Sequence, residues 1–138
     1  MSIPTELLVM MTGRLAPDNG PVTAESAVRV WTALFRKLSP LLGPLSTELI
    51  FARSLAARYP AFPWLPRLEP EAEPSAFARF APSLDGRSPE DIMEANRALL
   101  ESFTSALADL VGMQLATRLL RTAFPDDDAN KDTLEKTA

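Results

Sequence analysis

The chain is 138 residues long, 46% of its residues are hydrophobic, and its formal net charge is −4. This length and composition suit one domain with a substantial core. The acidic balance argues against general attraction to nucleic acid, and no apolar run approaches the ~18–20 residues that a membrane-crossing helix needs. We therefore expect neither a nucleic-acid-binding nor a membrane-spanning protein.

The chain contains no histidine and no cysteine. Their absence removes the commonest general base, the thiolate nucleophile and the usual zinc ligands. The five glycines are scattered singly, so no glycine-rich phosphate loop is present. The acidic run at residues 126–128 is interpreted as part of a solvated tail. We predict a protein that is not an enzyme, uses no metal or cofactor, and resides in the cytoplasm, where cysteine-free chains are unexceptional.

The first half of the chain predicts three helices. The first covers Pro4–Leu15, and a loop rich in turn-forming residues follows at 16–22. Thr23 is placed to cap the second helix, which we expect Pro40 to end. Pro44 opens the third helix. We expect its buried line to comprise Leu45, Leu49, Ala52, Leu55 and Ala56.

Prolines then dominate the middle of the chain. Residues 59–74 include five of them, which leaves no room for a regular helix or a central strand. We predict an extended connector there, followed by a short helical turn at 75–80.

The longest proline-free stretch, Glu90–Phe124, follows. Ser88 and Pro89 form a typical helix start, and apolar residues recur at helical spacing from Ile92 onward. Glycine within a helix costs about 1 kcal/mol relative to alanine, so we favour a break at Gly112, with one continuous helix as the alternative. Residues 126–138 are expected to form a loose acidic tail, outside a single domain that covers residues 1–125.

The two halves of the chain resemble each other. Arg-Leu-Ala-Pro at residues 14–17 matches Arg-Phe-Ala-Pro at residues 79–82. Each is followed by a turn, a capped amphipathic helix and an aliphatic pair before a glycine, at Gly43 and at Gly112. The match indicates either two related helix–break–helix units or a chance similarity among common residues. No alternating strand pattern stands out, so we predict an all-α, single-domain bundle of about five helices.

Two groups of side chains are candidate sites. The first is an aromatic strip between prolines, formed by Tyr59, Phe62, Trp64 and Leu65. A proline-stiffened strip of this kind suits presentation to a partner's groove. In the alternative, its apolar side chains turn inward and close the core, and a mixture of the two is also consistent with the pattern.

The second candidate site is a pair of arginines, Arg118 and Arg121, next to apolar residues. Guanidinium groups suit the binding of carboxylates and phosphates, which makes the pair a candidate anion contact. Capping of the helix C-terminus together with pairing to nearby acids is the alternative.

Amphipathic helices without catalytic residues favour a non-catalytic cytoplasmic module for protein interaction, regulation or signalling. We expect the chain to bind a protein partner, which in a homodimer would be a second copy of the same chain. The alternative is a bundle that binds a small apolar or amphipathic ligand. Four methionines are available to line an adaptable cavity for it: Met10, Met11, Met93 and Met113.

Overall fold

A computed structural model describes residues 5–16, 20–66 and 76–124. Within these ranges the chain forms helices and no strand, which confirms the all-α prediction. The helices are α1 (Thr5–Gly13), α2 (Ala24–Leu42), α3 (Pro44–Arg58), α4 (Ala76–Ser83), α5 (Pro89–Val111) and α6 (Met113–Ala123). Among the described residues, no helix combines the length and apolarity required to cross a bilayer.

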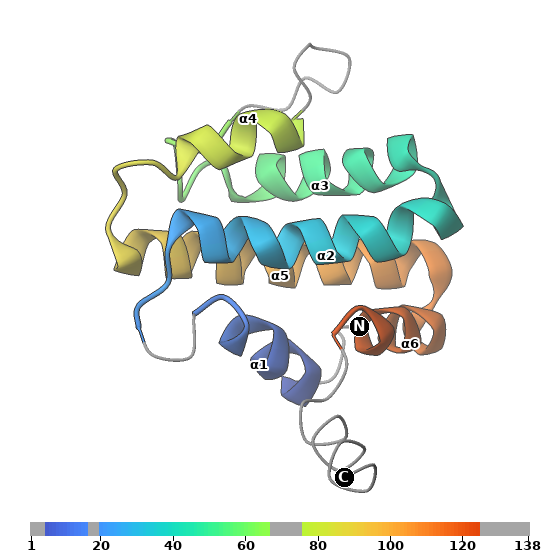
Figure 1. Cartoon of the computed structure of the whole chain (residues 1–138). Helices are drawn as coiled ribbons and strands as arrows, with labels where there is room; N and C mark the ends of the chain where they lie inside the picture. Colours follow the sequence, from blue (N-terminus) through green and yellow to red (C-terminus); the bar gives the residue numbers. More distant parts are fainter. Residues whose placement is uncertain (1–4, 17–19, 67–75, 125–138) are drawn as a thin grey trace, which may run out of the picture.

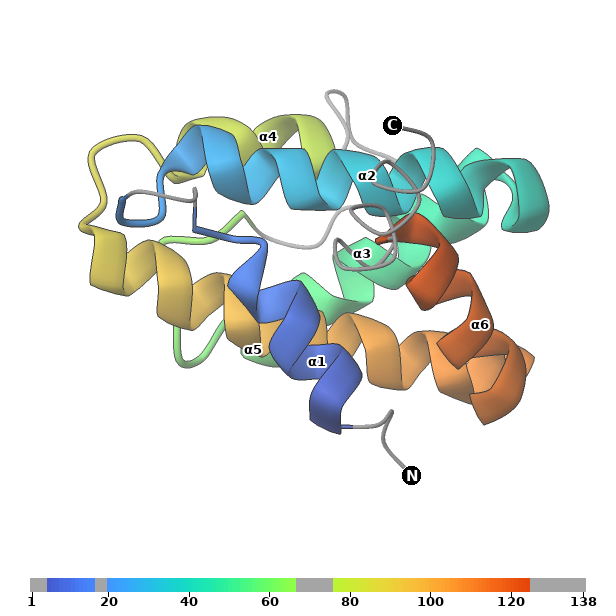
Figure 2. The same cartoon turned by 60° about the horizontal axis from the view of Figure 1, so that its bottom comes forward.

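The helices pack as a bundle around α2 and α5. These two run in the same direction, and α3 and α6 fold back along them, so that α3 packs on α5 and α6 packs on α2 (Figures 1 and 2). The short helices α4 and α1 lie on opposite sides of the bundle (Figure 1). The arrangement confirms the predicted single-domain bundle. Among the described residues the count rises from about five helices to six, because the short turn expected at 75–80 is the full helix α4.

Two glycines make the corners between consecutive helices. Gly43 has φ 94° and ψ 145°, and Gly112 has φ 94° and ψ 152°, a conformation that is essentially confined to glycine. Each glycine N–H donates to the carbonyl four residues earlier, at a distance of 2.8 Å. The predicted break at Gly112 is therefore confirmed, and the alternative of one continuous helix is wrong.

The prediction that Pro40 ends the second helix is wrong. Pro40 lies inside α2, which continues to Leu42. Pro40 sits in the last turn and is exposed, so its missing N–H removes one hydrogen bond close to the point where Gly43 ends the helix anyway. Similarly, the short turn expected at 75–80 is longer in the structure, because α4 extends through Pro82 to Ser83.

The polar contacts of α4 begin at its N-terminus. The Phe77 N–H donates to Glu48 Oε1 of α3 at 2.8 Å. A carboxylate is favourable there because the free N–H groups of a helix start carry partial positive charge. The contact holds α4 against α3, and Phe77 also stacks on Phe35 of α2 with ring centroids 4.4 Å apart.

The centre of the core is Trp31 of α2, which is fully buried. Its ring meets three phenylalanines edge to face, with centroids at 5.0 Å, 6.3 Å and 5.3 Å: Phe51, Phe80 and Phe103. Such edge-to-face pairs add stabilisation beyond the area they bury. Trp31 thereby joins α3, α4 and α5 to α2.

One buried hydrogen bond crosses the middle of the bundle. Trp31 Nε1 donates to Asn96 Oδ1 of α5 at 2.8 Å, and Asn96 Nδ2 donates to the Ile92 carbonyl at 2.7 Å. Asn96 is completely buried, so these bonds offset the cost of removing its amide from water. The bond fixes how α2 lies against α5.

Candidate functional site

The aromatic strip divides between core and surface. Leu65 is only 3% exposed and belongs to the core, while Tyr59, Phe62 and Trp64 are half-buried. Phe62 and Trp64 pack against the core and touch each other edge to face, and the Arg87 guanidinium lies 4.7 Å from the centroid of the Trp64 ring. Leu65 therefore presents no surface in this conformation, and the other three side chains are partly accessible. Their role as a partner contact stays a prediction. The part of the connector at 67–74 lies outside the described residues.

The two candidate arginines lie on the surface of α6. Arg121 pairs with Glu6 of α1 at 3.2 Å, and both side chains are more than half exposed. Arg118 is exposed, and no ion pair within the described ranges includes it. Of the two arginines, only Arg121 lies in the last turn of α6 and pairs with an acid among the described residues. The alternative of helix capping with acid pairing therefore also stays a prediction for the pair. Anion binding by the pair stays a prediction.

A third arginine, in α4, was missed by the sequence reasoning. The Nε and Nη2 atoms of Arg79 are buried without a hydrogen-bond partner in the part of the chain that the structure describes. Only burial distinguishes it from other arginines, and burial in this short helix was not evident from the sequence. Because an unpaired buried guanidinium is costly, Arg79 is a further candidate for contact with an anion.

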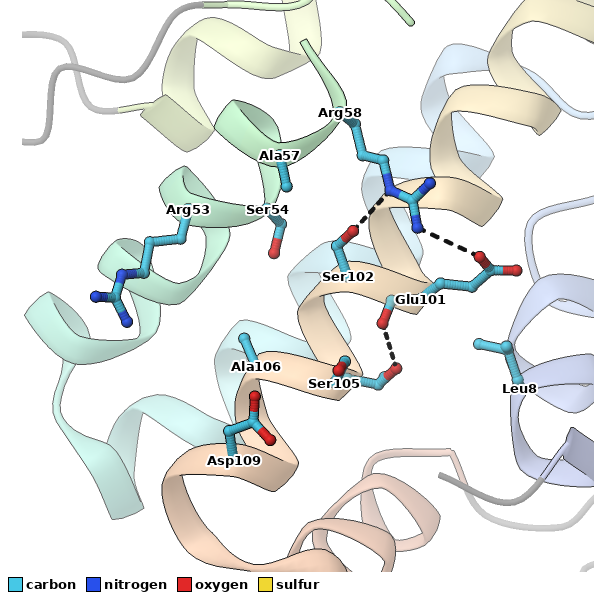
Figure 3. Close-up of a pocket in the computed structure, with 11 residues that line it drawn as sticks. Leu8, Arg53, Ser54, Ala57, Arg58, Glu101, Ser102, Ser105, Ala106 and Asp109 are labelled. Carbon is cyan, nitrogen blue, oxygen red and sulfur yellow. Dashed lines mark hydrogen bonds and ion pairs between the residues drawn. The ribbon is translucent and has the colours of Figure 1, made fainter. Parts of the chain in front are cut away.

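A groove of about 600 Å³ runs between α3 and α5 and is bounded at one side by Leu8 of α1 (Figure 3). Much of its lining is small: Ser54, Ala57, Ser102, Ser105 and Ala106. Arg58 crosses its upper end, where Nε donates to Ser102 Oγ at 2.7 Å and Nη2 lies 3.4 Å from Glu101 Oε2 (Figure 3). These contacts hold Arg58 in place and neutralise its charge.

Two opposite charges in the same groove have no such contact. Arg53 projects from α3, and Asp109 projects from the last turn of α5 (Figure 3). Both are exposed, and neither makes a hydrogen bond or an ion pair with a described residue. Among the described residues, the groove therefore offers one cation and one anion without an ion pair, beside a floor of small serine, threonine and alanine side chains.

Five exposed leucines lie close in sequence to the two glycine corners, and we call them the leucine patch. They are Leu41 (60% exposed), Leu45 (85%), Leu49 (44%), Leu110 (59%) and Leu115 (45%). All lie within six residues of Gly43 or Gly112, and the two glycine corners are at the same end of the molecule (Figures 1 and 2). Concentrations of exposed apolar side chains commonly mark interaction surfaces.

The exposure of Leu45 and Leu49 corrects the predicted buried line of α3. The prediction is correct for Ala52 and Leu55 and wrong for Leu45, Leu49 and Ala56, which is also exposed. The other buried residues of α3 are Thr47, Ile50, Phe51 and Ser54. The signal was present in the sequence. The series 47, 50, 51, 54 and 55 has the spacing of a helix face, but two of its members are hydroxyl residues, so the leucine series looked more apolar.

Within the described ranges, no group of three or more acidic side chains is placed to hold a metal ion. Comparison of the chain with protein-family models, curated protein sequences and solved structures finds no match in any of the three.

Proposed function

We propose that this chain is a non-catalytic helical interaction module that acts in the cytoplasm as a regulatory or signalling component and associates with itself. The observation that carries the proposal is the leucine patch. Its five side chains are between 44% and 85% exposed, whereas most large aliphatic side chains among the described residues are buried. Covering such side chains removes apolar surface from water, which drives association.

The buried hydroxyl groups support the non-catalytic part of the proposal. Thr47, Ser54 and Thr104 each donate to the backbone carbonyl four residues earlier, which for Thr47 belongs to Gly43 just before α3. These bonds satisfy the hydroxyls inside the fold. With no histidine in the chain, none of them has an imidazole, the commonest base that activates a serine or threonine nucleophile.

The alternative, a bundle that binds a small apolar or amphipathic ligand, stays a prediction. The groove between α3 and α5 is roomy enough for a small molecule, but four charged side chains line it: Arg53, Arg58, Glu101 and Asp109. That lining favours a polar contact over an apolar ligand.

Sedimentation velocity over a range of micromolar concentrations tests the self-association. We expect the weight-average mass to rise with concentration from 15.1 kDa toward twice that value. A mass that stays at the monomer value throughout would remove the homodimer from the proposal. The proposed interaction module would then have to bind a different protein, and that binding would be tested next.

A further inference from the structure

We propose that the leucine patch, together with Arg53 and Asp109, is the contact surface for a second copy of this chain in a two-fold symmetric dimer. The inference rests on the proposed self-association and adds the surface that carries it. It depends on three features: the positions of the leucines, the two unpaired charges, and the symmetry requirement of a homodimer.

The apolar and charged groups belong to neighbouring elements. Leu45, Leu49 and Arg53 follow one another at intervals of four residues, which places them along one face of α3. Asp109 and Leu110 lie in the last turn of α5. Because α3 runs back along α5, the first turns of α3 lie at the same end as the last turns of α5 (Figure 1). Arg53 and Asp109 line the same groove, which confirms that the two elements present these groups together.

The two charges are suited to a copy of the same surface. In a two-fold dimer, each group meets a different group of the partner, so the surface must be complementary to itself. Arg53 and Asp109 provide one positive and one negative charge, both exposed and both without an ion pair among the described residues. A two-fold axis that passes between them places Arg53 of each copy near Asp109 of the other. The leucines then face leucines.

The neighbouring charges and the small residues agree with this arrangement. Arg58 and Glu101, farther along the groove, already pair within one chain, so they do not compete for Arg53 or Asp109. Ala57, Ser105 and Ala106 have small side chains, so the lining of the groove there permits close approach of a partner helix. The patch is balanced in charge, which gives no preference for a strongly basic or acidic partner or for an anionic lipid surface.

Leu45→Asp tests the apolar part. Leu45 is 85% exposed and lies in the first turn of α3, where an aspartate is favourable for the helix, so the variant should fold with unchanged thermal stability. We expect the dissociation constant of the dimer, measured by sedimentation, to rise by about tenfold or more, because a charge would be buried where a leucine was. The matched control is Val9→Asp in α1, a 64% exposed residue outside the patch, which should leave the dissociation constant unchanged.

Charge reversal tests the pairing. Arg53→Glu and Asp109→Arg should each weaken the dimer, since each places like charges opposite each other. The double variant Arg53→Glu/Asp109→Arg should restore the dissociation constant to near that of the wild type. If the single variants weakened the dimer only by disturbing the surface, the double variant would not recover the wild-type dissociation constant.

The outcomes separate the two proposals. A wild-type dimer that is unaffected by Leu45→Asp, or a double charge reversal that fails to restore association, overturns the surface assignment and leaves self-association standing. A wild type that is monomeric at every concentration overturns both the assignment and the homodimer. A third outcome is that the chain shows no self-association but binds a different protein, with Leu45→Asp abolishing that binding. This result assigns the patch to that other protein and also overturns the inference.

Discussion

The two helix–break–helix units of this molecule have similar helix caps and glycine corners, and they differ in the residues that they place in the core. Gly43 and Gly112 adopt nearly the same backbone conformation, and each is preceded two residues earlier by an exposed leucine, 60% exposed in the first half and 59% in the second. The caps also correspond, since Thr23 and Ser88 each accept a hydrogen bond from the N–H three residues later. These matches favour two related units, which is one of the two interpretations of the similarity between the halves of the sequence.

The difference lies at the centre. Counted from the caps, Trp31 and Asn96 occupy equivalent positions in α2 and α5, yet one is a large aromatic residue and the other a small amide. The two side chains bond to each other, so equivalent positions of the two halves meet in the core. In addition, α5 has 23 residues against 19 in α2, which is about one extra turn. The two halves therefore share the backbone conformation of their glycine corners. At the equivalent positions that meet in the core, their side chains differ and are complementary to each other.

Disrupting the central contact should have the largest effect. Asn96→Ala leaves the Trp31 N–H unpaired in the core and creates a void, so we expect a loss of about 2–4 kcal/mol in the free energy of unfolding. Urea denaturation followed by circular dichroism measures it. Replacing both partners, as in Trp31→Phe/Asn96→Leu, should cost less than the sum of the two single changes, because neither polar group is left alone. Additive costs would show that the bond does not couple the halves.

The two glycine corners should be equally sensitive, with a smaller effect. An added Cβ meets nothing within 4 Å at Gly43 or at Gly112, so the cost of alanine there comes from the positive φ alone. We expect each substitution to lower the free energy of unfolding by about 1–3 kcal/mol. Gly13→Ala is the matched control, since Gly13 also has free space around it and does not have a positive φ. Clearly unequal costs at Gly43 and Gly112 would break the proposed equivalence.

The caps should show the smallest effect. Thr23 and Ser26 bond reciprocally, with Ser26 N–H to Thr23 Oγ1 at 3.0 Å and Thr23 N–H to Ser26 Oγ at 2.9 Å, whereas Ser88 makes a single cap bond to Asp91 N–H at 3.1 Å. We expect Thr23→Ala and Ser88→Ala each to cost about 1 kcal/mol in thermal or urea unfolding. The exchanges Thr23→Ser and Ser88→Thr should be nearly neutral. A large cost for either exchange would show that the caps are not interchangeable.

Much of the fold was predictable because it depends on local chemistry. The caps at Thr23 and Ser88, the helix start at Pro44 and the break at Gly112 all follow from the properties of single residues, and the structure has each of them. The error at Pro40 came from treating proline as a terminator although the last turn of a helix tolerates it.

The candidate site was less predictable because it depends on which helix face turns outward. The Leu45–Leu49 series and the series through Ile50 and Phe51 compete for the core within α3, and only packing against α5, α2 and α4 decides between them. The pairing of Arg58 with residues of α5, which leaves Arg53 free, likewise depends on contacts between helices distant in sequence. The roles of the aromatic strip and of Arg118 and Arg121 stay predictions.

The bond from Trp31 to Asn96 also bears on how the polypeptide is made. While the ribosome has released only the first sixty or so residues, the indole has no amide to bond with, and its phenylalanine neighbours Phe80 and Phe103 have not been synthesised. The amino-terminal unit therefore has an incomplete interior at that stage. Completion of this core must therefore wait until most of α5 has left the exit tunnel.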